Sequence, residues 1–255
     1  MFRRLVFAAS LGMIGTSAPA MVGGAPPATQ DIARHVVMIV GSRGNACTGT
    51  AVAGDLVLTA AHCVLAGAEY KLVDYDASHQ PLLKDVSSVA RHPQFDVNAV
   101  LAHRVTADVG LLKLTEPLPA RLVPVELSER VATAPGESFV VAGFGVTVRG
   151  DGRTGGTLRA ATLVSTGQPG ALQLRLTDPA TRNSRSGRGA CTGDSGAPVF
   201  EQTGGRWAVL GLVSWSTGPN NADGCGGLTG VTPLARYRGW ISEQAARFGS
   251  ALSSP

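Results

Sequence analysis

Three short segments carry residue types that together can perform nucleophilic catalysis. They are Leu58–Cys63, which contains His62, Ala107–Leu114, which contains Asp108, and Cys191–Pro198, which contains Ser195. A serine hydroxyl is almost fully protonated near neutral pH, so it becomes a nucleophile only when a neighbouring base accepts its proton. Histidine, with an ordinary pKa of about 6.5, is such a base, and a buried carboxylate can fix its tautomer. We therefore assign Ser195 as the nucleophile, His62 as the base and Asp108 as the carboxylate that orients the base.

Each assignment has a competing interpretation. Four other histidines are available, namely His35, His79, His92 and His103. Asp108 could be a turn residue that opens a strand, and Ser195 could be one more serine in a glycine-rich turn. The glycines at 193 and 196 favour a site at Ser195, because glycine lets the backbone approach a ligand closely.

The elements that must position these residues are mostly strands. The chain has 255 residues, of which 44% are hydrophobic, so it can bury a sizeable core. Short apolar or alternating runs, broken by Gly, Pro, Asn and Asp, occur at 36–40, 56–59, 109–114, 139–146, 172–176 and 209–215. Many short strands at such spacing predict an all-β barrel or sandwich. A proline-containing segment at 116–136 divides the strands into two groups, and only 234–248 has a helical pattern, from which Tyr237, Trp240 and Ile241 should dock on the strands.

The N-terminus has the pattern of a secretory signal peptide. Arg3 and Arg4 precede an apolar run at 5–15, and Ala18-Pro19-Ala20 then provides a cleavage site. The run is shorter than the ~20 residues that span a bilayer as a helix, although a membrane anchor is the alternative. We expect residues 1–20 to be removed, and the mature chain to be secreted, extracellular or periplasmic, without a membrane partner. In an oxidising compartment four cysteines indicate two disulfides, and the lack of a C-x-x-C pair argues against zinc.

The charge pattern does not indicate a nucleic-acid partner. The net charge is +4, and the arginines are scattered along the chain. Such scattered cations are typical of a solvated surface.

In their order along the chain, the three segments resemble the chymotrypsin/trypsin-like serine protease family. Met21-Val22-Gly23-Gly24, Gly143-Phe144-Gly145 and Val213-Ser214-Trp215-Ser216 also stand where that family has comparable strings. The resemblance implies two antiparallel six-stranded β-barrels with a C-terminal α-helix, in a peptidase domain at 21–250. Its N-terminal barrel would cover about 21–130, its C-terminal barrel about 131–233 and its helix about 234–248. Other disulfides common in animal members are absent, so the barrels must rely more on packing. The chain looks like a bacterial secreted member of the family.

The resemblance also implies roles for further residues. The backbone N–H groups of Gly193 and Ser195 would form the oxyanion hole, the pair of donors that stabilises the negatively charged oxygen. Four cysteines permit three pairings, and the family pattern pairs Cys47 with Cys63 and Cys191 with Cys225. Cleavage after Ala20 would free the amino group of Met21 to pair with Asp194 and so activate the enzyme.

The pocket for the substrate side chain is expected to be neutral. Gly189 stands where trypsin-like enzymes that bind Arg or Lys carry Asp, and a pocket without that charge has little reason to accept a cation. The resemblance places its walls at Ser214, Trp215, Ser216 and Gly230. Asp178 or Asp223 could still bring a charge to the pocket, and three arginines could favour acidic residues elsewhere in a substrate, at 182, 185 and 188.

Together these observations predict a secreted serine endopeptidase that acts through an acyl-enzyme. An esterase is disfavoured, because there the Asp and His follow the Ser, and because Ala197 breaks the G-x-S-x-G pattern. The alternative is a catalytically inactive binding module with the same fold, although such modules usually lose a member of the triad. We expect a monomer with a polypeptide substrate, no cofactor and no metal.

Overall fold

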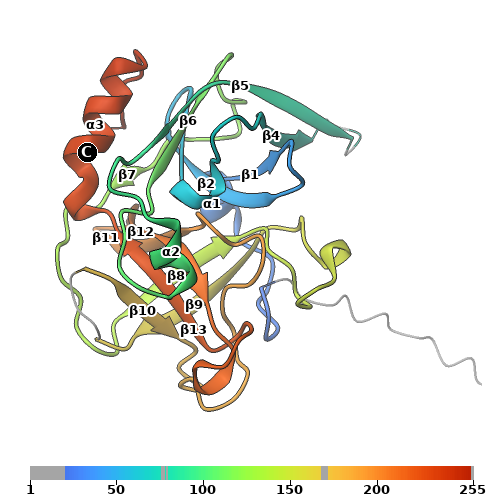
Figure 1. Cartoon of the computed structure of the whole chain (residues 1–255), viewed down its shortest axis with the longest axis vertical. Coiled ribbons are helices and arrows are strands. Elements are labelled where there is room, and N and C mark those ends of the chain that lie inside the picture. Colours follow the sequence, from blue (N-terminus) through green and yellow to red (C-terminus); the bar gives the residue numbers. More distant parts are fainter. Residues whose placement is uncertain (1–20, 76–77, 79, 168–171, 254–255) are drawn as a thin grey trace, which may run out of the picture.

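The computed structural model describes residues 21–253 except 76–77, 79 and 168–171 (Figure 1). The expected signal peptide at 1–20 lies outside the described residues, as does His79. Two groups of strands succeed each other along the chain, one on either side of the segment 116–136.

The first group closes into a six-stranded antiparallel barrel. Its strands are β1 (Val36–Gly41), β2 (Ala46–Ala53), β3 (Leu56–Thr59), β4 (Tyr70–Tyr75), β5 (Pro81–Arg91) and β6 (Gly110–Leu114). They pair in the order β1-β2-β3-β6-β5-β4, and β4 returns to β1 to close the barrel. The β-branched and leucine side chains of these runs fill the interior, with Ile39, Leu72 and Leu112 at or near zero exposure.

The second group forms the other barrel. Its strands are β8 (Ser138–Gly143), β9 (Arg159–Ser165), β10 (Leu174–Thr177), β11 (Pro198–Thr203), β12 (Arg206–Ser216) and β13 (Leu228–Pro233). They pair in the order β11-β8-β9-β10-β13-β12, and the pairing of β11 with β12 closes the ring. The short β7 (Glu126–Leu127) adds to β12 from outside in a parallel direction. The expected pair of six-stranded antiparallel barrels is thus confirmed.

Short helices link the strands. They are α1 (Gln30–Ala33), α2 (Val97–Leu101) and 3-10 turns at Ala61–Cys63, Gly152–Thr154 and Pro219–Asn221. At the C-terminus a 3-10 turn, Ala235–Tyr237, runs into α3 (Arg238–Arg247). This agrees with the expected helix, and Ile241 is its fully buried anchor. A shared apolar core, which includes Leu58 of the first barrel, Phe200 of the second and Ile241, holds the barrels and the helix together.

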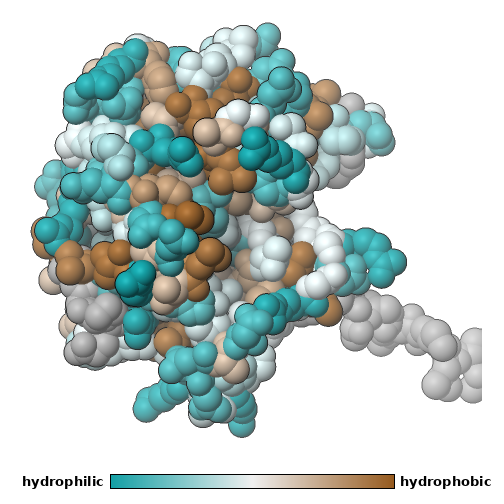
Figure 2. Space-filling model, in the orientation of Figure 1, coloured by the Kyte–Doolittle hydropathy of each residue, from teal (hydrophilic) through white to brown (hydrophobic). Residues whose placement is uncertain are grey.

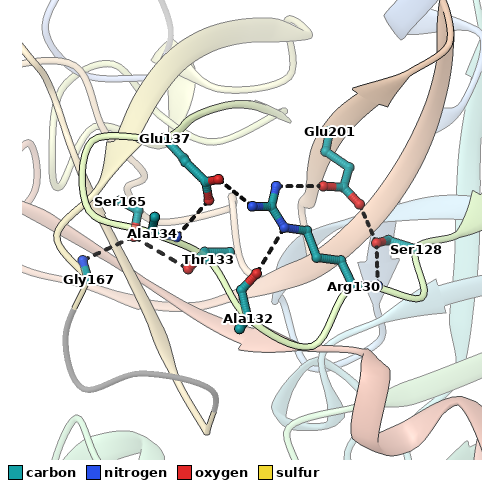
Figure 3. Close-up of polar contacts among 9 residues, drawn as sticks. All are labelled: Ser128, Arg130, Ala132, Thr133, Ala134, Glu137, Ser165, Gly167 and Glu201. Carbon is teal, nitrogen blue, oxygen red and sulfur yellow. Dashed lines mark hydrogen bonds and ion pairs between the residues drawn. The ribbon is translucent and has the colours of Figure 1, made fainter.

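A charged network fixes the segment between the barrels. Figure 3 shows the Arg130 guanidinium between the carboxylates of Glu137 and Glu201. Arg130 also donates from Nε to the Ala132 carbonyl at 2.9 Å, and the Ser128 hydroxyl bonds to Glu201. One cation therefore ties the segment to β8 and β11 at once.

The surface seen in Figure 2 is mixed, with hydrophobic patches separated by hydrophilic side chains. One patch lies over α2, where Val97 and Leu101 are 47% and 75% exposed. Within the described part of the chain, no helix is both long and apolar enough to span a membrane.

Candidate active site

His62 and Asp108 come together at the edge of the first barrel. His62 lies in the 3-10 turn that follows β3, and Asp108 lies just before β6, which pairs with β3. The ring Nδ1 of His62 is 2.8 Å from Oδ2 of Asp108, and the backbone N–H of His62 donates to Oδ1 at 2.9 Å. A carboxylate cannot donate, so Nδ1 carries the proton and Nε2 is left as the acceptor that a general base requires.

The Asp108 carboxylate is fully buried and accepts a third hydrogen bond from the other barrel. The donor is the hydroxyl of Ser214 on β12, at 2.5 Å from Oδ2. Three donors from both barrels hold the Asp108 carboxylate in place. The sequence predicted Ser214 as a pocket wall, and its bond to Asp108 was not foreseen.

Ser195 lies in a tight turn of the second barrel and faces the same cleft as His62. This cleft has a volume of about 330 Å³ and is also lined by Gly193, Trp215 and Ser216. Among the described residues no hydrogen bond joins the Ser195 hydroxyl to the His62 ring. Such bonds are often long in unliganded active sites and tighten when substrate binds.

The turn around Ser195 presents two unpaired backbone donors. Within the described part of the chain, neither the Gly193 nor the Ser195 N–H group donates to a protein acceptor. Gly193 has φ +96°, and a Cβ there would lie 2.9 Å from the Gly145 Cα. The Thr48 hydroxyl, from the first barrel, donates to the Gly193 carbonyl at 2.9 Å. This bond fixes the orientation of the peptide between Gly193 and Asp194, which lies between the two donors. This geometry suits an oxyanion hole.

Asp194 is buried behind the turn. Its carboxylate accepts from the backbone N–H groups of Gly145 and Cys191, each at 2.9 Å. The glycines of the string 143–145 make room for it, since a Cβ on Gly143 or Gly145 would lie 2.1 or 2.4 Å from carboxylate atoms. Burial raises the pKa of Asp194 to about 7. No basic side chain of the described residues forms an ion pair with it, and Met21 is fully buried in the neighbouring core.

In the segment expected to form the pocket, Thr229 lies close to both Gly189 and Ser216. A Cβ on Gly189 would lie 3.4 Å from the Thr229 hydroxyl, which accepts a hydrogen bond from the Ala190 N–H at 3.1 Å. Thr229 also stands opposite Ser216 in the β12–β13 register. Gly230 instead lies beneath Trp215, because its Cβ would be 2.0 Å from the indole ring. The register therefore places Thr229, and not Gly230, opposite Ser216.

Neither Asp178 nor Asp223 is among the described residues that line the cleft containing Ser195. Asp178 accepts from the backbone N–H groups of Ala180 and Arg188, at 2.9 and 2.8 Å. Asp223 is exposed and pairs with Arg149 at 2.8 Å. The arginines at 182, 185 and 188 are exposed and have no ion pair among the described residues.

The two disulfides have the pairing that the resemblance implied. Cys47 on β2 is bonded to Cys63, which follows His62, and Cys191 is bonded to Cys225. The first ties the histidine turn to the barrel, and the second joins the Ser195 turn to the loop before β13.

The remaining described histidines have other surroundings. His35 is buried and bonds through Nδ1 to the Val123 carbonyl at 2.6 Å, and burial lowers its pKa. His92 packs against Tyr237 and Trp240, and His103 stacks on Trp215. Of the histidines that the structure describes, only His62 is hydrogen-bonded to a carboxylate. No group of three His, Cys, Asp or Glu side chains suited to a metal occurs within the described ranges.

Comparison with known proteins agrees with the fold and this geometry. The sequence profile of the trypsin family matches residues 21–241, so the chain belongs to the trypsin family. Members of this family are generally serine endopeptidases, which act on polypeptides.

Individual members of the family have low sequence identity to this chain. The chain is 29% identical to a vitellin-degrading protease of Bombyx mori, over 83% of this chain and 80% of that protein. It is 32% identical to serine protease 7 of Drosophila melanogaster, over 80% of this chain and 58% of that protein. Vitamin K-dependent protein C of Oryctolagus cuniculus is 27% identical over 93% of this chain and 55% of its own length. These relatives are animal proteins, so they give no support to the expected bacterial origin.

Proposed function

We propose that this protein is a secreted serine endopeptidase with Ser195, His62 and Asp108 as its catalytic triad. The observation that carries the proposal is the Asp108 carboxylate, which holds His62 from behind while the ring faces the cleft that contains Ser195. The two disulfides fit an oxidising compartment, as secretion after removal of residues 1–20 requires. The enzyme acts as a monomer.

The chemistry follows from the positions of these groups. Ser195 Oγ attacks the carbonyl carbon of the scissile bond, and its proton passes to Nε2 of His62. The carbonyl oxygen becomes an oxyanion that accepts from the Gly193 and Ser195 N–H groups. The C–N bond then breaks, the imidazolium gives its proton to the leaving amine, and an acyl-enzyme remains. Water attacks the ester with His62 again as base, which releases the carboxyl product and restores Ser195.

The pocket should accept a small neutral side chain. Gly189 contributes no charge, while Ser216 and Thr229 face each other across adjacent strands and narrow the space. Neither Asp178 nor Asp223 lines the cleft that contains Ser195, which supports a pocket without a negative charge.

Activation is proposed to follow removal of residues 1–20. A buried carboxylate whose pKa is raised to about 7 is stabilised as an anion only if a cation reaches it. The amino group of Met21 would become that cation once it is freed, and Met21 is already buried in the core next to the turn. Its pairing with Asp194 would order Gly193 and the oxyanion hole.

Labelling with a fluorophosphonate probe tests the proposal. The secreted protein and its Ser195→Ala variant are treated with the probe, and the labelled band is sequenced from its N-terminus. Labelling of the native protein alone, with Met21 leading, is the expected result. No labelling despite a Met21 terminus would instead support the alternative, an inactive binding module, and labelling only after a further cut would contradict activation at Met21.

A further inference from the structure

Trp215 lies in one row with residues of two neighbouring strands. Arg175 on β10 stands opposite Gly230 on β13, and Gly230 stands opposite Trp215 on β12. The indole occupies the space that a Cβ on Gly230 would need, since that atom would lie 2.0 Å from the ring. Because Gly230 leaves this space open, the Arg175 guanidinium comes within 5.6 Å of the centre of the indole, a distance at which a cation is attracted to the ring.

A second basic side chain covers the same indole. His103, in the loop that follows α2, stacks on Trp215 with 4.6 Å between ring centroids and 19° between ring planes. It has φ +52°, a left-handed conformation that few residues other than glycine adopt. The indole is only 8% exposed as a result. Two basic side chains, His103 and Arg175, therefore contact the indole of Trp215, which lines the cleft. Of these two, Arg175 is permanently charged.

This cluster has donors without acceptors. The Arg175 Nε and the Trp215 Nε1 are both buried, and neither has a hydrogen-bond partner. No Asp or Glu of the described residues forms an ion pair with Arg175. Buried donors are rarely left unpaired, because each costs the free energy of its lost hydration. Arg175 as a residue is only partly buried, so its terminal guanidinium N–H groups, which have no carboxylate partner among the described residues, are suited to receive an acceptor, preferably an anion, from another molecule.

We propose that Arg175, positioned by Trp215, is a specificity-determining residue that binds a carboxylate side chain of the substrate. The inference rests on the proposed function, and it places an Asp or Glu two to four residues before the scissile bond. The side chain that enters the pocket beside Ser216 belongs to the residue whose carbonyl Ser195 attacks. Trp215 is next to Ser216 and lines the same cleft, and we place the substrate residues that pass it on the acyl side of the scissile bond.

Peptide substrates with a single varied position test this subsite. Each carries Ala before an aminomethylcoumarin leaving group, and Glu, Gln or Lys at the second, third or fourth position from the cleavage point. For native enzyme we expect Glu to exceed Gln in kcat/KM by about fivefold to tenfold at one of these positions, with Lys the poorest. Arg175→Gln should bring the Glu/Gln ratio to about 1, whereas Arg175→Lys should retain part of it. The preference should weaken at high salt.

The matched control is Arg247→Gln. It removes the same charge from the exposed end of α3, where Arg247 pairs with Glu243, and it should leave the Glu/Gln ratio unchanged. A native ratio of 1 at all three positions would overturn the proposal, as would a ratio that survives Arg175→Gln. Urea midpoints of the variants show that each is folded.

Failure of the subsite and failure of the proposed function give different results. If the native protein hydrolyses none of the peptides and resists the fluorophosphonate probe, the proposed function fails. The subsite is then tested by the Kd values of the Glu and Gln peptides for Ser195→Ala. Tighter binding of the Glu peptide, lost on adding Arg175→Gln, supports the subsite, and equal Kd values overturn it.

Discussion

The buried carboxyl of Asp194 should make the stability of this protein depend on what precedes Met21. In the chain that retains residues 1–20, burial raises the pKa of Asp194 from 3.8 to about 7. Each pKa unit corresponds to about 1.4 kcal/mol, so ionising this group in the folded state costs roughly 4 kcal/mol. The folded protein holds the proton up to about pH 7, while the unfolded chain releases it near pH 4. The contribution of Asp194 to the free energy of unfolding should therefore be complete below pH 4 and fall as the pH rises through this window.

A free amino group at Met21 should reverse this dependence. Pairing would lower the pKa of Asp194 and raise that of the α-amino group above its ordinary value of about 7.7–8.0. The stability that the amino group gains is complete below its unfolded pKa and is lost only as the pH passes its raised folded pKa. Between pH 4 and 7 the chain that begins at Met21 should thus not lose stability through Asp194.

Urea unfolding of two forms tests this reasoning, both with Ser195→Ala to prevent self-digestion. One form begins at Met21 and the other carries a single glycine before it. Between pH 4.5 and 7.0 we expect the extended form to lose up to roughly 3 kcal/mol relative to the other. Adding Asp194→Asn should abolish the difference, although one amide oxygen cannot replace both carboxylate acceptors of the Gly145 and Cys191 N–H groups. If the free energy of unfolding depends on pH in the same way in both forms that retain Asp194, with and without the added glycine, the pairing of Met21 with Asp194 is refuted.

Three further outcomes follow from single contacts. Ser214→Ala removes a donor to Asp108 and should lower kcat/KM about tenfold or more; steady-state kinetics that match the native enzyme would contradict this role. Gly193→Ala should lower kcat about 100-fold and also cost about 1–3 kcal/mol in urea, because of its φ of +96° and its contact with Gly145. Arg130→Gln should lower the free energy of unfolding by about 1–2 kcal/mol, because it leaves the partly buried Glu201 without its cation. We expect a lower urea midpoint and an unaltered kcat/KM.

Much of the fold could be predicted because local patterns determine it. The apolar run at 56–59 became β3 at the same bounds, and the helical pattern at 234–248 became the C-terminal turn and α3. The proximity of His62 and Asp108 likewise depends on the neighbouring strands β3 and β6. The Ser214 contact to Asp108 could not be predicted in this way, because it joins residues 106 positions apart on different barrels.

The pocket shows where counting along the sequence fails. A register shift lies between Val213 and Trp215 on β12, so Val213 faces Val231 while Trp215 faces Gly230. Such a bulge changes which residue of β13 stands opposite a given residue of β12, and no short sequence motif predicts it. Without the shift Ser216 would stand opposite Leu228, whereas the shifted register places Thr229 opposite Ser216. The same register brings Gly230 beneath the indole and Arg175 beside it, so the features expected to set substrate preference arise from strand pairing, whereas the reacting groups lie in short recognisable segments.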